Sequence, residues 1–362
     1  MAAVSRRTFA RSLVASMAGG SYLGNSMESA PGRQLGRSPS LTDVDGILVG
    51  HCTLPGRPTG CTVITSRTPF VAGVDVRGGA PGTRETDLLR PENTVENVNA
   101  VLISGGSAFG LDAAGGVVKF LEEKGVGVEV RGIRVPIVCA AILFDLSLGD
   151  SKIRPDAKAG YEAAKGASDA AVLEGNVGAG AGCTVGKMLG LEHAMKAGLG
   201  SWAANRADGL RVGALVAVNC VGDVVDPAQK RIMAGARGSE GNSFLDTMEQ
   251  IRRGHGAPPL FRDNTVLGVV ATNAALSKAQ CSKVAQMAHD ALARCIYPSH
   301  TPWDGDTVFA IATGRWSSDQ TADVGVIGAL AADVLSTAIL RGVQKAESWG
   351  PYPSCRSLRT CR

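Results

Sequence analysis

The feature that most constrains the fold is a short apolar run that directly follows a polar loop broken by glycine and proline. The loop covers residues 252–264 and the run covers residues 266–272. Because the run is short, rich in β-branched side chains and bounded by turn residues, it predicts a β-strand that is covered on both faces. Thr265 lies at the mouth of this strand, where its side chain would be held rigidly.

The rest of the chain alternates similar apolar runs with helical periodicity. The predicted strands are residues 62–65, 71–76, 100–104, 214–218, 266–272 and 308–313. Amphipathic helices are predicted at residues 112–124 and 278–295 from apolar side chains with helical spacing. Residues 323–343 are apolar almost all round, which predicts the most buried helix. This alternation predicts an α/β fold in which helices pack on sheets.

The composition agrees with a layered core and argues against two classes of partner. Hydrophobic residues make up 44% of the chain and aromatic residues only 4%, with 47 glycines, which fits close packing of helices on sheets. The formal charge of +4 is small and most of the excess lies in the termini. Without a basic stripe interleaved with aromatics, nucleic acid is not an expected partner. The five histidines are scattered, so no metal site is expected.

The two ends of the chain are predicted to lie outside the fold. Residues 1–40 contain the twin arginines Arg6 and Arg7 and resemble a twin-arginine export signal followed by a linker. This predicts a periplasmic or secreted protein without a stable membrane anchor, and a basic leader on a cytoplasmic protein is the alternative. Residues 41–346 are expected to form one domain and residues 347–362 a loose tail. The nine cysteines lack a C-x-x-C pair and are predicted to be buried small hydrophobes rather than a disulfide framework.

A glycine-rich stretch at residues 177–188 contains Lys187 but matches neither phosphate-binding fingerprint. Ala181 and Met188 stand where a Walker A loop needs glycine and Ser or Thr, and Cys183 stands where the dinucleotide fingerprint needs its third glycine. No cofactor is therefore expected. On the residues alone, Lys187 is either a solvated charge or a cation brought close to something small.

Five polar residues have both a structural and a catalytic interpretation. A cut between Asn264 and Thr265 would give Thr265 a hydroxyl nucleophile and a free α-amine, whereas an uncut junction is an ordinary loop-to-strand boundary. Asn219 ends an apolar strand and is either a turn residue or an oxyanion donor. Asp304 and Asp306 form either a turn or a carboxylate pair whose pKa values are pushed apart.

Four long motifs occur in order along the chain: VDVRGGAPGTRET at 74–86, ISGGSAFGLDAAG at 103–115, DNTVLGVVATNA at 263–274 and HTPWDGDTVFAIAT at 300–313. Together they resemble the DmpA-type aminopeptidase family of self-cleaving N-terminal-nucleophile hydrolases, which includes the endo-type nylon-oligomer hydrolases. The resemblance covers roughly residues 41–345. It implies a four-layer α-β-β-α sandwich, a fold type shared with ornithine acetyltransferases, and self-cleavage between Asn264 and Thr265.

The resemblance also implies roles for individual residues. Thr265 matches the nucleophile, Asn219 the oxyanion donor and Lys187 a lysine of the catalytic centre, while the two aspartates match residues that flank the nucleophile in the nylon hydrolases. Phe144 stands where characterised relatives have a substrate-site tyrosine, so it is either an aromatic wall without the hydroxyl or ordinary core packing. A homo-oligomer of processed heterodimers is implied as well.

The function predicted on this basis is a self-processing amidohydrolase or aminopeptidase that acts on short peptides or aminoacyl amides. Short, uncharged or apolar N-terminal groups are expected to be preferred over linear aminohexanoate oligomers. The alternatives are a hydrolase of aminohexanoate oligomers, an acyl transferase similar to ornithine acetyltransferase, and a non-catalytic binding protein that keeps the fold and never matures.

Overall fold

The computed structural model describes residues 37–238, 243–255, 264–317 and 321–361. The chain divides into two units, Met1–Arg37 and Ser38–Arg362, and the described helices and strands belong to the second unit. Arg6 and Arg7, on which the export prediction rests, lie outside the described residues. Leu41, the first residue of the predicted domain, is fully buried.

The second unit contains strands and helices along its whole length. The strands are β1 (Ile47–Thr53), β2 (Gly60–Val76), β3 (Thr83–Arg84), β4 (Val98–Ser104), β5 (Val128–Val130), β6 (Ile133–Val135), β7 (Val138–Ile142), β8 (Thr184–Val185), β9 (Met195–Lys196), β10 (Leu199–Asn205), β11 (Arg211–Asn219), β12 (Asp223–Asp226), β13 (Arg231–Ala234), β14 (Thr265–Thr272), β15 (Ile296–Tyr297) and β16 (Thr307–Ala312). The α-helices are α1 (Ala113–Glu123), α2 (Ala157–Lys165), α3 (Thr247–Arg252), α4 (Lys278–Ala288), α5 (Asp290–Cys295), α6 (Val324–Gln344) and α7 (Cys355–Leu358).

The long strand β2 joins two sheets. Its first half pairs with β1 and β4, and its second half pairs with β16 after a register shift between Thr65 and Phe70. The hydrogen-bonded order is β10-β11-β14-β16-β2-β4-β7-β3, with β1 added beside β2. Only β14–β16 and β4–β7 among these pairs are parallel. The two strands predicted at residues 62–65 and 71–76 are therefore parts of one continuous strand.

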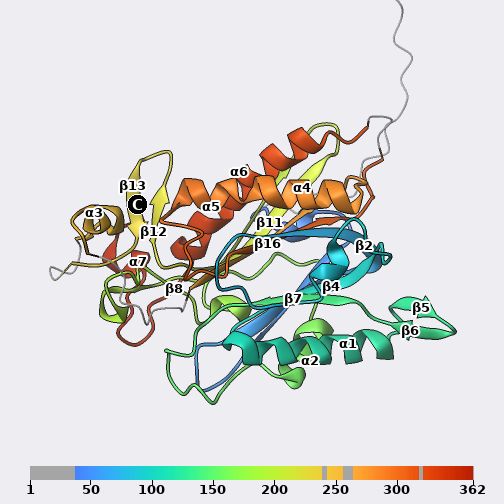
Figure 1. Cartoon of the computed structure of the whole chain (residues 1–362), viewed down its shortest axis with the longest axis horizontal. Helices are drawn as coiled ribbons and strands as arrows, with labels where there is room; N and C mark the ends of the chain where they lie inside the picture. The colour runs from blue at the N-terminus through green and yellow to red at the C-terminus, as the bar shows by residue number, and fades with distance from the viewer. Residues whose placement is uncertain (1–36, 239–242, 256–263, 318–320, 362) are drawn as a thin grey trace, which may run out of the picture. The chain divides into compact units, whose positions relative to one another are not determined.

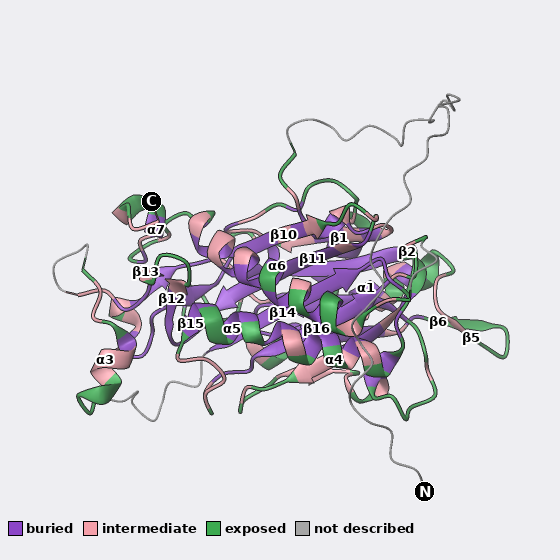
Figure 2. Cartoon of the chain, turned by 90° about the horizontal axis from the view of Figure 1, so that it is seen from above, coloured by how far each residue is buried: buried purple, intermediate pink, exposed green. Residues whose placement is uncertain are grey.

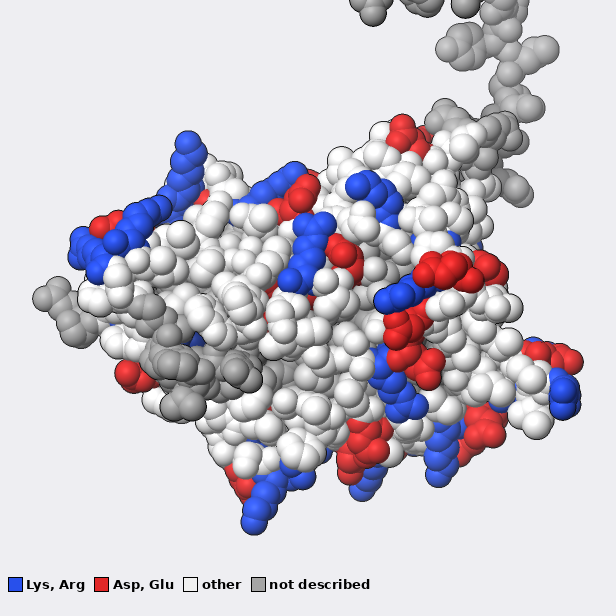
Figure 3. Space-filling model, in the orientation of Figure 1, with Lys and Arg blue, Asp and Glu red and all other residues white. Residues whose placement is uncertain are grey.

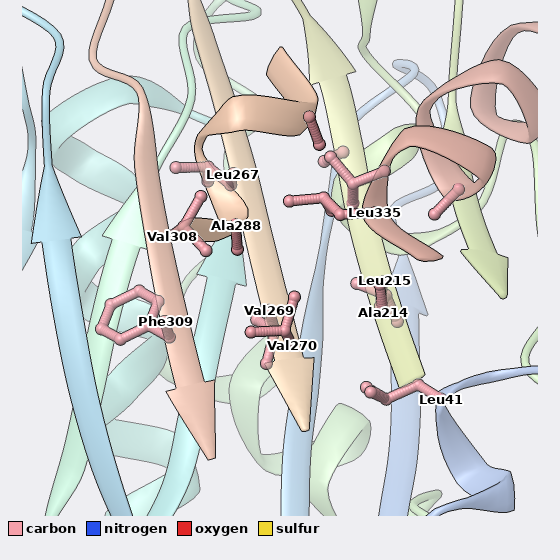
Figure 4. Close-up of a cluster of buried hydrophobic side chains, with 14 of the residues drawn as sticks. Leu41, Ala214, Leu215, Leu267, Val269, Val270, Ala288, Val308, Phe309 and Leu335 are labelled. Carbon is pink, nitrogen blue, oxygen red and sulfur yellow. The ribbon is translucent and has the colours of Figure 1, made fainter. Parts of the chain in front are cut away.

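Helices cover the outer face of each sheet, which confirms the predicted four-layer α-β-β-α sandwich. Figure 1 shows α4, α5 and α6 on one side of the strands and α1 and α2 on the other. Successive residues of β4 face opposite ways: Ala100 and Leu102 pack against α1 and α2, whereas Val101 and Ile103 join the larger core. Part of that core, which β11, β14, β16, α4 and α6 build, is drawn in Figure 4.

The helices largely follow the sequence pattern. α1 and α6 lie within one residue of their predicted bounds, but the helix predicted at residues 278–295 is divided into α4 and α5 at His289. α6 is the one described helix that is long and apolar enough to cross a membrane, and it packs on β10 and β11 instead. This contact is close because Gly200 of β10 lies against Ala338 of α6, where a Cβ would collide with backbone.

The tail expected to be loose is ordered in its described part. Ser354 caps α7 by accepting a hydrogen bond from the Ser357 N–H, and Cys355 is fully buried and forms a disulfide with Cys361. This disulfide corrects the expectation that all cysteines are unpaired. The other seven are free and six of these are buried, as the prediction of small buried hydrophobes requires.

The surface charges are mixed in sign. On the face shown in Figure 3, the described Lys and Arg side chains lie among Asp and Glu side chains. Exposed ion pairs among the described residues include Arg134 with Glu129 and Arg252 with Glu249. Such pairs contribute little to stability because water screens them.

Candidate active site

Thr265 lies in the middle of the main sheet, at the start of β14. It is 4% exposed, and its partner across the antiparallel ladder is Asn219, the last residue of β11. Directly opposed residues in such a pair project their side chains from the same face of the sheet. The fold therefore brings together two residues that the sequence places in separate motifs.

Lys187 is buried beside Asn219 and is not a solvated charge. The loop after β8 is fixed by the Lys187 N–H, which donates to the Val221 carbonyl at 2.9 Å. The Lys187 Nζ donates to the Asn219 Oδ1 at 2.9 Å and to the Asn219 carbonyl at 3.3 Å. Only 2% of Lys187 is exposed. A buried ammonium strengthens the electrostatic field of the site because water screens it poorly.

The Asn219 side chain has a defined orientation. Its Oδ1 accepts from Lys187 and from the Thr184 N–H at 3.1 Å, and its Nδ2 donates to the Phe144 carbonyl at 2.9 Å. Phe144 is thus connected to the site through its main chain. Its side chain is half-buried and belongs to none of the hydrophobic core clusters of the described residues.

Asp304 is a buried carboxylate with only one of its oxygens hydrogen-bonded. Its Oδ2 accepts from the Thr301 N–H at 2.9 Å and from the Thr301 hydroxyl at 2.6 Å. Its Oδ1 is buried and has no hydrogen-bond partner. Burial, aided by the neighbouring charge of Asp306, raises the pKa of Asp304 to about 6. This carboxylate can therefore exchange a proton near neutral pH.

Asp306, in contrast, uses both oxygens. Its Oδ1 accepts from the Val266 N–H at 2.8 Å, directly after the Thr265 residue. Its Oδ2 accepts from the His300 N–H at 3.0 Å and the His300 Nδ1 at 2.9 Å. Asp306 is therefore fixed against the backbone of β14.

The peptide bond between Asn264 and Thr265 lies at the centre of these groups. The Asn264 carbonyl accepts from the Gly305 N–H at 2.9 Å and also from the Thr265 hydroxyl. A Cβ at Gly305 would lie 2.7 Å from the Thr265 Oγ1 and 2.8 Å from the Ala80 carbonyl, so a side chain there would displace the hydroxyl. Both polar atoms of the Asn264 side chain are buried without a partner.

The structure thus gathers Thr265, Asn219 and Lys187 with the two aspartates, and it adds residues that the sequence analysis did not single out. His300 and Thr301 hold the carboxylates, and the Gly305 N–H contacts the Asn264 carbonyl. All three belong to the HTPWDGD motif, so their closeness in sequence to the aspartates was the available signal. The polar loop predicted at residues 252–264 is described as far as His255 and again at Asn264, and residues 256–263 lie outside the described residues.

Within the described ranges, no group of three or more His, Cys, Asp or Glu side chains could hold a metal ion. The polar groups around Thr265 are its own hydroxyl, the two carboxylates, the Lys187 ammonium and backbone amides. Such a set suits acyl transfer, because it combines a nucleophile, a proton acceptor and donors for an oxyanion.

Comparison with known proteins assigns the family. The model of peptidase family S58 matches residues 39–352. The chain belongs to peptidase family S58. This confirms the resemblance inferred from the four motifs, and it makes the protein an amide-bond hydrolase.

Relatives in this family carry two kinds of name. An uncharacterized aminopeptidase of Mycobacterium leprae (strain TN) is 45% identical over 342 residues, which are 87% of this chain and 92% of the relative. A 6-aminohexanoate-oligomer endohydrolase of Paenarthrobacter ureafaciens is 29% identical over 335 residues, which are 87% of this chain and 89% of the relative.

A solved structure supports the fold. The L-aminopeptidase D-Ala-esterase/amidase of Ochrobactrum anthropi superposes with a TM-score of 0.65 at 20% sequence identity, over 90% of this chain and 94% of that one. It is described as a variant of the Ntn hydrolase fold. The sandwich of this S58 chain is therefore of that type.

Proposed function

We propose that this S58 hydrolase is a self-processing aminopeptidase, in which Thr265 first cleaves its own chain and then serves as the N-terminal nucleophile. The observation that carries the proposal is the arrangement at Asn264. Its carbonyl oxygen accepts from both the Thr265 hydroxyl and the Gly305 N–H. Nucleophile, scissile bond and oxyanion donor are thus next to one another.

In the self-cleavage step, the Thr265 Oγ1 attacks the Asn264 carbonyl carbon. The Gly305 N–H stabilises the negative charge that develops on the oxygen, a kind of contact that contributes roughly 3–4 kcal/mol in other enzymes. The C–N bond then breaks and an ester remains between Asn264 and the hydroxyl. Water hydrolyses the ester, which leaves chains 1–264 and 265–362 and restores the hydroxyl.

Asp304 is the proton carrier of this step. The β-bridge between Asn264 and Asp304 places the two residues side by side, and the Asp304 Oδ1 is unpartnered. It accepts the proton of the Thr265 hydroxyl and returns it to the leaving nitrogen. A carboxylate whose pKa is raised to about 6 suits both tasks near neutral pH.

After cleavage, the new α-amine of Thr265 takes part in substrate turnover. An α-amino group has an ordinary pKa of roughly 7.7–8.0, and the positive charge of Lys187 favours its neutral, basic form. This amine takes the proton of the Thr265 hydroxyl, which attacks the substrate carbonyl. The C–N bond of the substrate breaks, the proton passes to the leaving amine, and water hydrolyses the acyl-enzyme. The Asn219 Nδ2, which the Phe144 carbonyl orients, donates a hydrogen bond to the oxyanion that forms on the substrate.

Aminoacyl amides and short peptides are the proposed substrates, ahead of aminohexanoate oligomers. The relative that is 45% identical is named an aminopeptidase, whereas the oligomer hydrolase is 29% identical. This order of preference is tested by comparing turnover rates for aminoacyl p-nitroanilides and for an aminohexanoate oligomer at equal concentration. Faster turnover of the oligomer would reverse it.

The self-processing step is tested with Thr265→Ala and the unmodified protein. Intact mass spectrometry should find the unmodified protein cut after Asn264, and the variant as one uncut, inactive chain. Thr265→Ser is the matched control, since it keeps a hydroxyl and should still be cut. Two fragments from Thr265→Ala would overturn the proposal.

A further inference from the structure

We propose that His300 is a positioning residue of this site, which holds the Asp306 carboxylate against the backbone of the nucleophile strand. The inference deepens the proposed function and rests on it for its catalytic consequence. Its structural part, a chain of hydrogen bonds from His300 through Asp306 to Val266, can be measured without any activity.

The geometry of the chain is specific. Both the main-chain N–H and the ring Nδ1 of His300 contact one oxygen of Asp306, at 3.0 and 2.9 Å. The other oxygen accepts from the Val266 N–H at 2.8 Å. Val266 shares a peptide bond with Thr265, so the carboxylate connects the imidazole to the residue that carries the nucleophile.

The backbone of His300 is adapted to this double contact. Its φ is +56°, a left-handed conformation that is uncommon for residues other than glycine, although Asn, Asp and His adopt it more often than most. In this conformation the N–H and the ring Nδ1 of His300 both contact the same oxygen of Asp306. An uncommon backbone conformation at a site indicates that the surrounding structure holds it in place.

The other side of the His300 ring is packed against a second histidine. The His289 ring lies edge-on with its centroid 4.8 Å away, and its Nε2 donates to the Asp75 carbonyl at 2.9 Å. His289 is fully buried, and burial lowers its pKa to about 4, so it stays neutral at neutral pH. The His300 Nε2 and the His289 Nδ1 are both buried without a hydrogen-bond partner. The Asp306 carboxylate is therefore the hydrogen-bonding partner of the His300 ring.

This arrangement explains why Asp306 can remain a fixed carboxylate in a buried site. A buried carboxylate needs hydrogen-bond donors in place of water, and His300 supplies two of the three described donors. Without the ring, Oδ2 keeps only the main-chain N–H. With one of its three donors lost, the carboxylate is held less firmly against Val266, and the approach of the Thr265 hydroxyl to the carbonyl is less well fixed.

Two substitutions separate the donor from the backbone conformation. His300→Asn tolerates the left-handed φ and its Nδ2 can replace the ring Nδ1 as a donor. His300→Gly also tolerates this φ but keeps only the main-chain N–H. His193→Asn is the matched control, because His193 is another part-buried histidine whose Nδ1 contacts a carbonyl, that of Arg237 at 2.7 Å.

The catalytic measurement compares self-cleavage rates and the kcat and KM for an aminoacyl p-nitroanilide. His300→Gly should slow self-cleavage and lower kcat by tenfold or more with little change in KM, whereas His300→Asn should stay within about threefold of the unmodified protein. His193→Asn should behave as unmodified. Equal loss in the Asn and Gly variants would mean that ring packing, not the donor, matters, and unchanged kinetics of His300→Gly would remove the role altogether.

The structural measurement is amide hydrogen exchange at Val266, made in the uncut Thr265→Ala protein by mass spectrometry with single-residue fragmentation. Adding His300→Gly should speed exchange at Val266 by tenfold or more, and adding His300→Asn should not. Unchanged exchange in the Gly variant would overturn the proposed chain of hydrogen bonds. Failure of the unmodified protein to cleave itself would instead overturn only the proposed function.

Discussion

Asp304 and Asp306 lie on either side of one glycine, yet their carboxylates have different surroundings. Asp306 accepts hydrogen bonds on both oxygens, while Asp304 keeps one buried oxygen without a partner. The difference determines which carboxylate can carry a proton. In the proposed mechanism, the unpartnered oxygen of Asp304 carries the proton of the Thr265 hydroxyl, whereas Asp306 stays hydrogen-bonded to the backbone of β14.

The raised pKa of Asp304 makes the stability of the precursor depend on pH. The folded pKa of about 6 lies above the ordinary value of 3.8, so folding favours the protonated form. The stabilising contribution is complete below pH 3.8 and is lost as the pH rises through 6. A difference of this size corresponds to about 3 kcal/mol in the free energy of unfolding.

We therefore expect Asp304→Asn to raise stability and to prevent self-cleavage. In the Thr265→Ala background, where no cleavage interferes, the substitution should raise the Tm by a few degrees at pH 7.5. At pH 4.5 the gain should be much smaller, because the aspartic acid is then already neutral. In the protein that keeps Thr265, Asp304→Asn should remain a single chain. A lower Tm at pH 7.5, or normal cleavage, would contradict the assignment.

The sequence could predict which residues belong to the candidate site, but not the different hydrogen bonding of Asp304 and Asp306. Thr265, Asn219 and Lys187 are placed by motifs and by the ends of apolar strands. The free oxygen of Asp304 depends on where Thr301 and His300 direct their donors, and these directions follow from a left-handed turn at His300. Neither residue has a spacing that by itself indicates catalysis, and their closeness in sequence to the aspartates does not show which carboxylate each one contacts.

At the scale of elements, the loop after β7 shows how distant residues hold the site. Asp145 follows Phe144 directly and forms a fully buried ion pair with Arg57, with the atoms 2.5 Å apart. Its second oxygen accepts from the Thr59 hydroxyl at 2.6 Å. These bonds fix the loop whose Phe144 carbonyl orients the Asn219 amide.

Asp145→Ala should therefore be strongly destabilising, because it leaves the Arg57 guanidinium buried without its counter-charge. Removing one partner of a buried pair costs about 3–5 kcal/mol. Chemical denaturation of the uncut Thr265→Ala protein, with and without Asp145→Ala, measures this loss. Asp169→Ala is the control, since its pair with Arg67 is exposed on both sides and little change is expected. Equal effects of the two substitutions would contradict a structural role for the buried pair.

The elements also show where periodicity stops being informative. The polar residues Ser66–Thr68 interrupt the apolar pattern of β2, so the sequence predicts two strands where a register shift allows one. The division between α4 and α5 at His289 does not interrupt the apolar spacing, so this spacing cannot predict it. The order of strands, which puts β14 between β11 and β16, depends on contacts between distant segments that local patterns do not encode.

At the scale of the whole molecule, the proposed cleavage point would divide the chain without dividing the core. β14 and β16 belong to residues 265–362, but their outer neighbours β11 and β2 belong to residues 1–264. The strands near the middle of Figure 2 are coloured as buried, and every residue of β14 and β16 is buried. The shorter fragment thus supplies the centre of one sheet, and the longer fragment supplies both of its flanks.

The two fragments should consequently stay together after self-cleavage. Separating them would expose both edges of the β14–β16 pair and the apolar core that α4 and α6 cover, at roughly 25 cal/mol for each Å² of apolar surface. Size-exclusion chromatography in native buffer should therefore give one peak that contains both chains, and denaturing electrophoresis should resolve them. Residues 265–362 produced alone should be insoluble or unfolded, since they lack β11 and β2. Elution of the fragments as separate folded species would show that the sheet order described above does not hold the cleaved protein together.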